Sequence, residues 1–166
     1  MRSFIVFAAL ALAVAGCAQL GIQEPALSRG IQASEVDWSR KTGRNTVAGI
    51  ASLRAGGTVH TCAGQNANLI PDTPYARARL ERIFGSTVKG MRPASQGAVK
   101  FESDDPLYVS TMRTTRCDAS GSFSFPRIPD GVWYATTSVK WGQSEGGSMM
   151  QRVEVSGGRL VKVTLP

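Results

Sequence analysis

Cys17 is the residue whose surroundings point most directly to a chemical modification. It follows one positive charge, Arg2, and an apolar stretch over residues 4–15. That stretch is roughly 12 residues long, which is the length of a signal-peptide core and too short for a membrane span. Ala15 and Gly16 come immediately before the cysteine, and two small residues suit the narrow site of a signal peptidase. Residues 1–16 are therefore predicted to be an export signal.

The run Val14-Ala15-Gly16-Cys17 resembles the lipobox of bacterial lipoproteins. The resemblance implies that the Cys17 thiol receives a diacylglyceryl group, that the chain is cut before it, and that the new amino group is often acylated, as by palmitate. Two or three acyl chains anchor a protein stably. Ala18 stands where a retention signal would place Asp, which favours the periplasmic face of the outer membrane in a Gram-negative cell. The alternative is an ordinary cleaved signal followed by a free cysteine.

Cys62 and Cys117 remain once Cys17 carries lipid. Two cysteines in an oxidising envelope most simply form a disulfide, and a loop of about 55 residues closed in this way would favour the fold by about 4 kcal/mol. The alternative is a metal pair, because His60 and Asp118 lie beside the two cysteines. No Cys-x-x-Cys motif and no second histidine support it. We therefore expect a disulfide and no metal or cofactor.

Catalytic groups are sparse in this sequence. His60 is the only histidine, and a pairing with Ser52 or Cys62 would give it a nucleophile, although a histidine on a strand beside a disulfide is more often a surface residue. Asp104 and Asp105 offer two carboxylates for calcium, but a Ser-Asp-Asp-Pro run usually forms a turn. No catalytic residue is predicted, and we expect that the protein is not an enzyme.

Three aromatic residues, Trp133, Tyr134 and Trp141, are the best candidates for binding a ligand. Exposed rings on a sheet can stack on sugars or anchor a peptide. Trp133 and Trp141 share the parity of Ala135 and Val139, which favours core packing for both tryptophans, and Tyr134 is expected to point to the opposite face.

Arg77, Arg79 and Arg82 form the densest group of charges. They could contact lipid phosphates or an acidic partner, whereas the simpler interpretation is a solvated helix face. The formal net charge of the chain is +7, and removal of Arg2 with the signal leaves about +6, scattered without a run of five like charges. Nucleic acid is not expected as a partner, because an exported lipoprotein does not normally meet it.

The segment before the domain, residues 17–45, is expected to be the lipidated N-terminus and a flexible linker. Leu27, Ile31 and Trp38 are isolated apolar residues in it without a sustained period. Residues 46–166 are expected to form one domain, whose many Gly, Pro, Thr, Ser and Val residues favour short strands and turns.

One helix is predicted at residues 75–84, with Asp72 or Thr73 as its cap and Gly85 at its end. Residues 86–106 are expected to be a long loop, with one short extended piece at 98–101. The predicted strands are 46–53, 58–62, 66–71, 107–117, 122–125, 132–141, 149–155 and 161–165. This pattern of about seven strands and regular turns predicts an all-β fold, an antiparallel Greek-key β-sandwich with one short helix.

Three segments resemble the carboxypeptidase regulatory-like, or prealbumin-like (transthyretin-like), domain. They are the Val-x-Gly at Val47–Gly49, the turn Asp-x-x-Gly and Phe-x-Phe within 117–125, and the Pro-x-Gly-x-x-Tyr within 128–134. The resemblance implies a β-sandwich that serves as an accessory module in enzymes. The zinc-carboxypeptidase motif His-x-x-Glu is absent, since Ala63 stands where Glu would be. The resemblance therefore argues against catalysis.

These features together predict a non-enzymatic, membrane-anchored envelope lipoprotein that acts as an interaction or scaffolding module. Its partners would be the membrane, through the lipid anchor, and another envelope protein. The alternative is a carbohydrate- or cell-wall-binding module on a lipid anchor. That alternative needs Trp or Tyr side chains exposed on one face, and a fully buried set would count against it.

Overall fold

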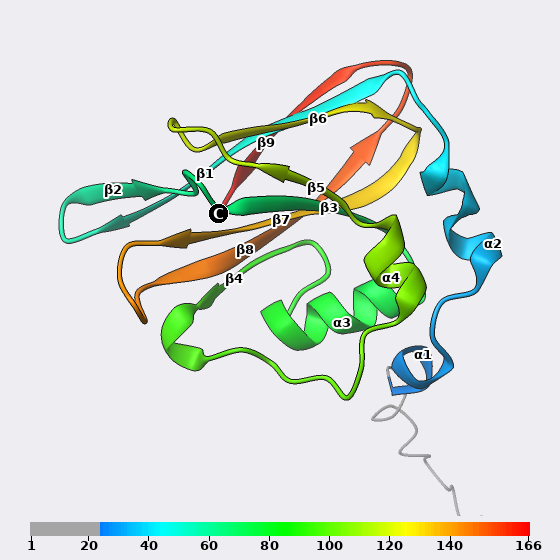
Figure 1. Ribbon diagram of the computed structural model, residues 1–166, viewed down its shortest axis with the longest axis horizontal. Coiled ribbons are helices and arrows are strands. Elements are labelled where there is room, and N and C mark those ends of the chain that lie inside the picture. The colour runs from blue at the N-terminus through cyan, green and yellow to red at the C-terminus, as the bar shows by residue number, and fades with distance from the viewer. Residues whose placement is uncertain (1–23) are drawn as a thin grey trace, which may run out of the picture.

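The computed structural model describes residues 24–166, so the predicted signal and Cys17 lie outside the described residues. This part of the chain folds as three layers: two β-sheets and a group of helices against the second sheet (Figure 1). The strands are β1 (Asn45–Ala55), β2 (Thr58–Thr61), β3 (Asn66–Pro71), β4 (Lys89–Pro93), β5 (Arg113–Arg116), β6 (Ser122–Ile128), β7 (Gly131–Lys140), β8 (Gly146–Val155) and β9 (Leu160–Leu165).

The first sheet has the order β2-β1-β6, and β9 also pairs with β1. The second sheet has the order β4-β8-β7-β3-β5. Every strand pair is antiparallel except β1 with β9, which run parallel from the pair Thr46–Leu160 to the pair Ala51–Leu165. The predicted all-β sandwich is confirmed. Within residues 24–166 there are nine strands where about seven were expected.

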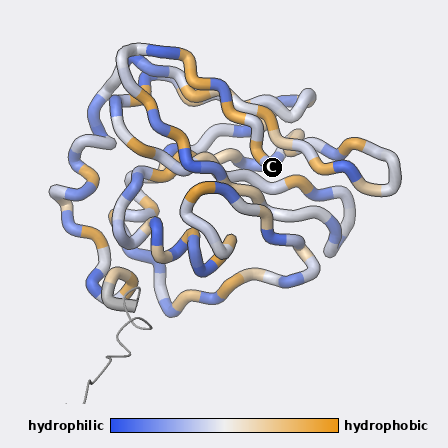
Figure 2. The backbone as a smooth tube through the Cα atoms, turned by 180° about the vertical axis from the view of Figure 1, so that it is seen from behind, coloured by the Kyte–Doolittle hydropathy of each residue, from blue (hydrophilic) through white to orange (hydrophobic). Residues whose placement is uncertain are grey.

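The main core lies between the two sheets and follows the alternation of the strands (Figure 2). On β7, Trp133, Ala135 and Val139 face this core and are fully buried. Phe123 and Phe125 of β6 enter it from the first sheet, with ring centroids 5.9 Å apart. The period-two pattern of the sequence thus places one face of each sheet inward.

Cys62 and Cys117 form the disulfide that their number predicted, and this excludes the metal pair. Cys62 follows β2 of the first sheet and Cys117 follows β5 of the second, so the bond joins the two sheets at one end of the sandwich. Both cysteines are buried.

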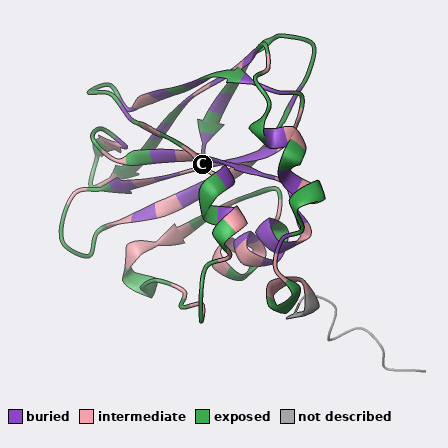
Figure 3. Cartoon of the chain, turned by 45° about the vertical axis from the view of Figure 1, so that its right-hand side comes forward, coloured by how far each residue is buried: buried purple, intermediate pink, exposed green. Residues whose placement is uncertain are grey.

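A second core lies on the opposite face of the second sheet, under the helices (Figure 3). The main helix, α3 (Pro74–Phe84), begins at Thr73, whose hydroxyl accepts a hydrogen bond from the Ala76 N–H at 3.0 Å, and ends at Gly85 in the left-handed conformation. Leu80 of α3 packs in this core with Tyr134 and Met150 of the sheet. In the described part of the chain, no helix combines the length and the apolarity that a membrane crossing requires.

The structure differs from the expected linker over residues 24–44. This segment forms α1 (Glu24–Arg29), α2 (Ala33–Val36) and the 3-10 helix η1 (Asp37–Arg40). Ile31 and Val36 are buried in the second core, and the Trp38 ring packs edge-on against Trp133 with centroids 5.0 Å apart. These residues belong to the fold, because their few apolar side chains each enter a core.

The prediction of a strand over 107–117 is wrong for its first half. Residues Pro106–Thr111 form helix α4, and only Arg113–Arg116 are a strand. The Asp105 carboxylate accepts from the Leu107 N–H at 2.7 Å, and Pro106 occupies the first turn. These two start signals outweigh the strand propensity of the residues that follow.

The long loop expected at residues 86–106 is also interrupted. It contains β4 and a second 3-10 helix, η2 (Ala94–Gln96), while residues 98–101 are not the extended strand that was expected. The single helix of the prediction is therefore too few, since α1, α2 and α4 accompany α3 in the described chain.

Candidate functional site

The three aromatic candidates differ in how far their side chains are buried. Trp133 and Tyr134 are fully buried, Trp133 between the sheets and Tyr134 under the helices, so neither ring can stack on a sugar. Tyr134 does point to the face opposite Trp133, as the parity predicted, but α3 covers that face. Trp141 is half-buried and stacks on the His60 ring, with centroids 4.3 Å apart and an interplanar angle of 18°. Among the three, only Trp141 keeps an accessible surface.

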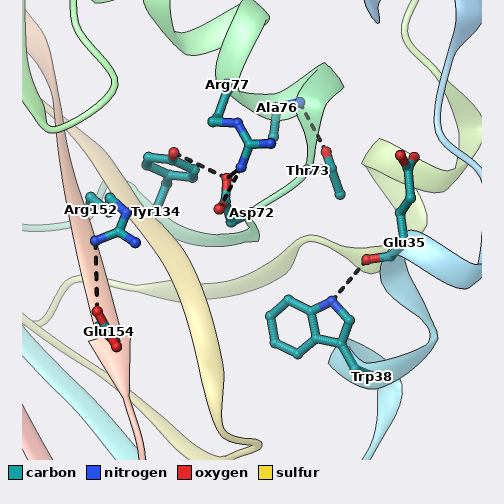
Figure 4. A network of polar contacts seen from close by, with 9 residues as sticks. All are labelled: Glu35, Trp38, Asp72, Thr73, Ala76, Arg77, Tyr134, Arg152 and Glu154. Carbon is teal, nitrogen blue, oxygen red and sulfur yellow. Dashed lines mark hydrogen bonds and ion pairs between the residues drawn. The ribbon is translucent and has the colours of Figure 1, made fainter.

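Arg77 belongs to a structural network rather than to a free basic surface (Figure 4). Its Nη1 donates to both carboxylate oxygens of Asp72, at 2.8 and 2.7 Å, and the Tyr134 hydroxyl donates to Oδ1 of the same carboxylate at 3.2 Å. Burial, followed by the negative charge of Asp72, raises the pKa of Tyr134 to about 12. The charge of Arg77 is therefore used to balance Asp72 above the second sheet.

Arg79 is the most enclosed of the three arginines, with a side chain 11% exposed. Its Cζ lies 3.8 Å from the centroid of the Phe101 ring and 5.0 Å from that of Tyr108. Its Nη2 pairs with Asp104 Oδ1 at 2.6 Å, while its buried Nε has no hydrogen-bond partner among residues 24–166. Arg79 therefore holds the segment 97–105 against α3 through cation–π contacts and one ion pair.

Two hollows lie beside this segment and share Phe101 in their lining, and we call them together the Phe101 groove. The first, of about 340 Å³, is lined by Tyr75, Arg82 and Lys100 among others. The second, of about 320 Å³, is lined by Arg79, Arg92 and Lys140 among others. The Arg82 Cζ lies 5.7 Å from the Phe101 centroid. The structure thus brings Arg79 and Arg82 together around one aromatic ring and leaves Arg77 outside.

The Phe101 groove combines an aromatic face with several cationic donors. Glu102 is the one acidic side chain among the residues that line the two hollows. Guanidinium and ammonium groups form charge-assisted hydrogen bonds to carboxylates, and an aromatic ring offers a flat apolar surface beside them. Such a groove suits a polar ligand that carries negative charge.

The sequence did not single out Phe101, Lys100, Arg92 or Lys140. The available signal was the spacing of Arg79 and Arg82, which places both on neighbouring positions of one helix. The segment 97–105, which packs against α3, has no periodic pattern of apolar residues. Its position beside the helix is set by tertiary packing, so no local pattern predicts it.

Asp104 and Asp105 have structural contacts, in keeping with the prediction that the Ser-Asp-Asp-Pro run forms a turn. Asp105 caps α4 and also accepts from the Ile31 N–H at 3.0 Å, and Asp104 pairs with Arg79. Over residues 24–166, no three His, Cys, Asp or Glu side chains are grouped so as to hold a metal ion. Asp104 thus ties this segment to α3, and Asp105 ties the start of α4 to the backbone at Ile31.

No protein-family model matches the chain, and no curated protein matches its sequence. Among solved structures, the chain is similar to a Pseudomonas aeruginosa protein that has been proposed to bind carbohydrate, with 26% identity and a TM-score of 0.65, over 81% of this chain and 96% of that one. A minor pilin of Streptococcus agalactiae is a more distant match, with 17% identity and a TM-score of 0.37, over 76% of this chain and 43% of the pilin. Both neighbours are rich in β-structure.

Proposed function

We propose that this protein is a non-enzymatic binding module of the cell envelope, held by lipid on Cys17 at the periplasmic face of the outer membrane, and that its Phe101 groove binds an acidic cell-wall glycan. The export signal, the lipobox resemblance and Ala18 support the location. The two-sheet fold supports kinship with the carboxypeptidase regulatory-like domains, which serve as accessory modules.

One observation carries the choice of ligand: Arg82 and Lys100 line one hollow, Lys140 lines the other, and Phe101 lines both. Carboxylate-bearing sugars offer anionic oxygens to such donors and an apolar ring face to the aromatic side chain. The Pseudomonas aeruginosa neighbour, proposed to bind carbohydrate, gives independent support for this ligand class. The site differs from the one that the sequence suggested, because two of its three aromatic candidates are buried.

Binding to purified peptidoglycan and to an acidic polysaccharide tests the proposal. Phe101→Ser and Arg82→Gln are each expected to weaken binding about tenfold, since each removes one charge-assisted or stacking contact. Arg54→Gln is the matched control, because Arg54 is an exposed arginine on the β1–β2 hairpin, outside the groove. Equal binding by all four proteins, or loss in the Arg54 variant alone, would contradict the proposed site.

A protein partner is the second candidate, favoured by the edge of the second sheet. β4 is the outer strand of that sheet, and its neighbourhood exposes two apolar side chains, Val88 at 62% and Met91 at 43%. An edge strand can accept a further strand from another protein.

Cross-linking in cells, followed by mass spectrometry, separates the two candidates. Recovery of one dominant envelope protein, lost in a Met91→Lys variant and kept in Phe101→Ser, would favour the edge of β4. Recovery of cell-wall glycan, lost in Phe101→Ser, would favour the groove. A Cys17→Ser variant that still fractionates with membranes would overturn the lipid anchor.

A further inference from the structure

A second basic hollow lies on another part of the molecule, away from the residues of the Phe101 groove. It has a volume of about 520 Å³ and lies between η1, the end of α4, the start of β5 and the end of β6. Three arginines from three of these elements line it: Arg40, Arg113 and Arg127. The other lining residues are Ser39, Thr42, Ser110, Thr111, Met112 and Pro126, so no acidic side chain lines the hollow.

Arg127 reaches this hollow through an irregularity in β6. Asn45 pairs with Ile128 and Val47 pairs with Phe125, so Pro126 and Arg127 together stand opposite the single residue Thr46. This is a β-bulge, a feature that redirects a side chain out of the regular ladder. Arg127 has φ of 58° and is the only non-glycine residue with positive φ in the described chain. The fold thus keeps an arginine where glycine would fit without strain.

The guanidinium of Arg113 is fixed in place. Its Nη2 donates to the Ser39 carbonyl at 2.7 Å and to the Lys41 carbonyl at 3.1 Å, and its Cζ lies 5.5 Å from the Trp133 ring. Burial lowers the pKa of the Arg113 guanidinium, so an anion nearby would offset an electrostatic cost. Its carbonyl partners are neutral and leave its charge unbalanced.

The charges of Arg40 and Arg127 are unbalanced as well. The four ion pairs found among residues 24–166 involve Arg29, Arg77, Arg79 and Arg152, and none involves these two residues or Arg113. Three positive charges that share one hollow without a counter-ion repel one another. A ligand with two or more anionic oxygens would remove this repulsion.

We propose that the hollow lined by Arg40, Arg113 and Arg127 binds a phosphate ester. Guanidinium forks match the oxygens of phosphate, and Thr42, which also lines the hollow, adds a hydroxyl as a neutral donor. The volume exceeds that of a free phosphate, which leaves space for the group that carries the ester. In an envelope protein that group would be a sugar or a lipid headgroup, and both present the same phosphate chemistry.

The test measures binding of three probes to the whole mature chain at physiological ionic strength: inorganic phosphate, glucosamine 6-phosphate, and vesicles that contain phosphatidylglycerol. Arg127→Gly is the central variant, because it removes one guanidinium and also relieves the backbone, so a folding failure is not expected. Arg40→Gln is the second variant. Both are expected to weaken binding about tenfold or more. Arg54→Gln is the control for net charge.

Tighter binding of glucosamine 6-phosphate than of inorganic phosphate, lost in both variants, identifies a phosphorylated sugar as the source. Vesicle binding lost in both variants, without binding of the sugar phosphate, identifies a headgroup. The proposal is overturned if no probe binds, or if Arg54→Gln weakens binding as much as Arg127→Gly. None of these variants touches Phe101, so failure here leaves the proposed glycan groove standing.

Discussion

At the scale of the residue, the charged side chains divide by whether the fold itself balances them. Asp72 balances Arg77, and Asp104 balances Arg79. Asp105 is consumed by backbone N–H groups at the start of α4. The arginines at the end of β6 and around η1 have no such partner in the described chain, which is why they carry the second proposal.

Tyr134 should make stability depend on pH in the alkaline range. Its pKa is raised from 10.0 to about 12 in the folded chain, so between these values the folded state holds a proton that the unfolded state has lost. The stabilisation is complete below pH 10 and decreases as the pH rises toward 12, at most tenfold in the unfolding constant per pH unit. Urea unfolding at several alkaline pH values should show a shallower decrease for Tyr134→Phe. An identical decrease in both proteins would contradict this assignment.

Arg127 should lower stability through its backbone conformation. At φ of 58° a side chain costs roughly 1 kcal/mol that glycine does not. We expect Arg127→Gly to be more stable than Arg127→Ala by about 1 kcal/mol, because both lose the guanidinium and only one keeps the strain. Chemical denaturation of the two variants measures the difference. Alanine as stable as glycine would mean that the bulge relaxes without cost.

At the scale of the element, the N-terminal helices are part of the folded unit. Trp38 donates from Nε1 to the Glu35 carbonyl at 2.8 Å, and its ring lies over Gly131, where any Cβ would clash with it. The ring thereby covers Trp133 at one end of the main core. Glycine at position 131 is required for this close approach.

Removal of residues before Thr46 should therefore destabilise the chain strongly. A chain that begins at Thr46 loses the buried Ile31 and Val36 and the partly buried Trp38 from the cores, and loss of a large buried apolar side chain costs about 2–5 kcal/mol. We expect that chain to unfold at much lower urea concentration than a chain that begins at Glu24, or not to fold. Circular dichroism during urea titration compares them. Equal midpoints would show that residues 24–45 are dispensable.

The elements also show which parts of the fold the sequence could predict. The boundaries of β9 and α3 follow from local signals, namely period-two alternation for β9 and the Thr73 and Gly85 caps for α3. Residues 107–111 have strand propensity but form a helix, because Asp105 and Pro106 start one. The docking of residues 24–44 depends on single apolar residues with no period. Likewise, Tyr134 is buried because α3 packs across the second sheet. Local signals predict the helix, but no local pattern predicts where it packs.

At the scale of the whole molecule, the three layers set which faces can bind. The helices cover one face of the second sheet, and the first sheet covers the other (Figures 1 and 3). The first proposed site lies beside residues 97–105, and the second lies between η1, α4, β5 and β6. Both proposed sites therefore lie at the margins of the sandwich, where many β-sandwich proteins bind their ligands.

The disulfide should contribute substantially to the stability of this frame. It joins positions 55 residues apart and links the two sheets, so its loss releases a long loop in the unfolded chain. We expect the double variant Cys62→Ser with Cys117→Ser to lose about 2–5 kcal/mol in free energy of unfolding. Denaturation with and without reductant provides the comparison. If the oxidised protein and the double variant unfolded at the same denaturant concentration, the disulfide would make no net contribution to the free energy of unfolding.

The burial of the disulfide limits when it can be formed or reduced. Both sulfur-bearing residues are buried, at 0% and 3% exposure, so exchange with small thiols or oxidants must wait for the sandwich to open. We therefore expect a copy that folds after oxidation to keep its cross-link and a copy that folds reduced to keep two enclosed thiols. The thiol content of the folded protein would then report the redox state under which it folded, and alkylation under native and denaturing conditions measures it.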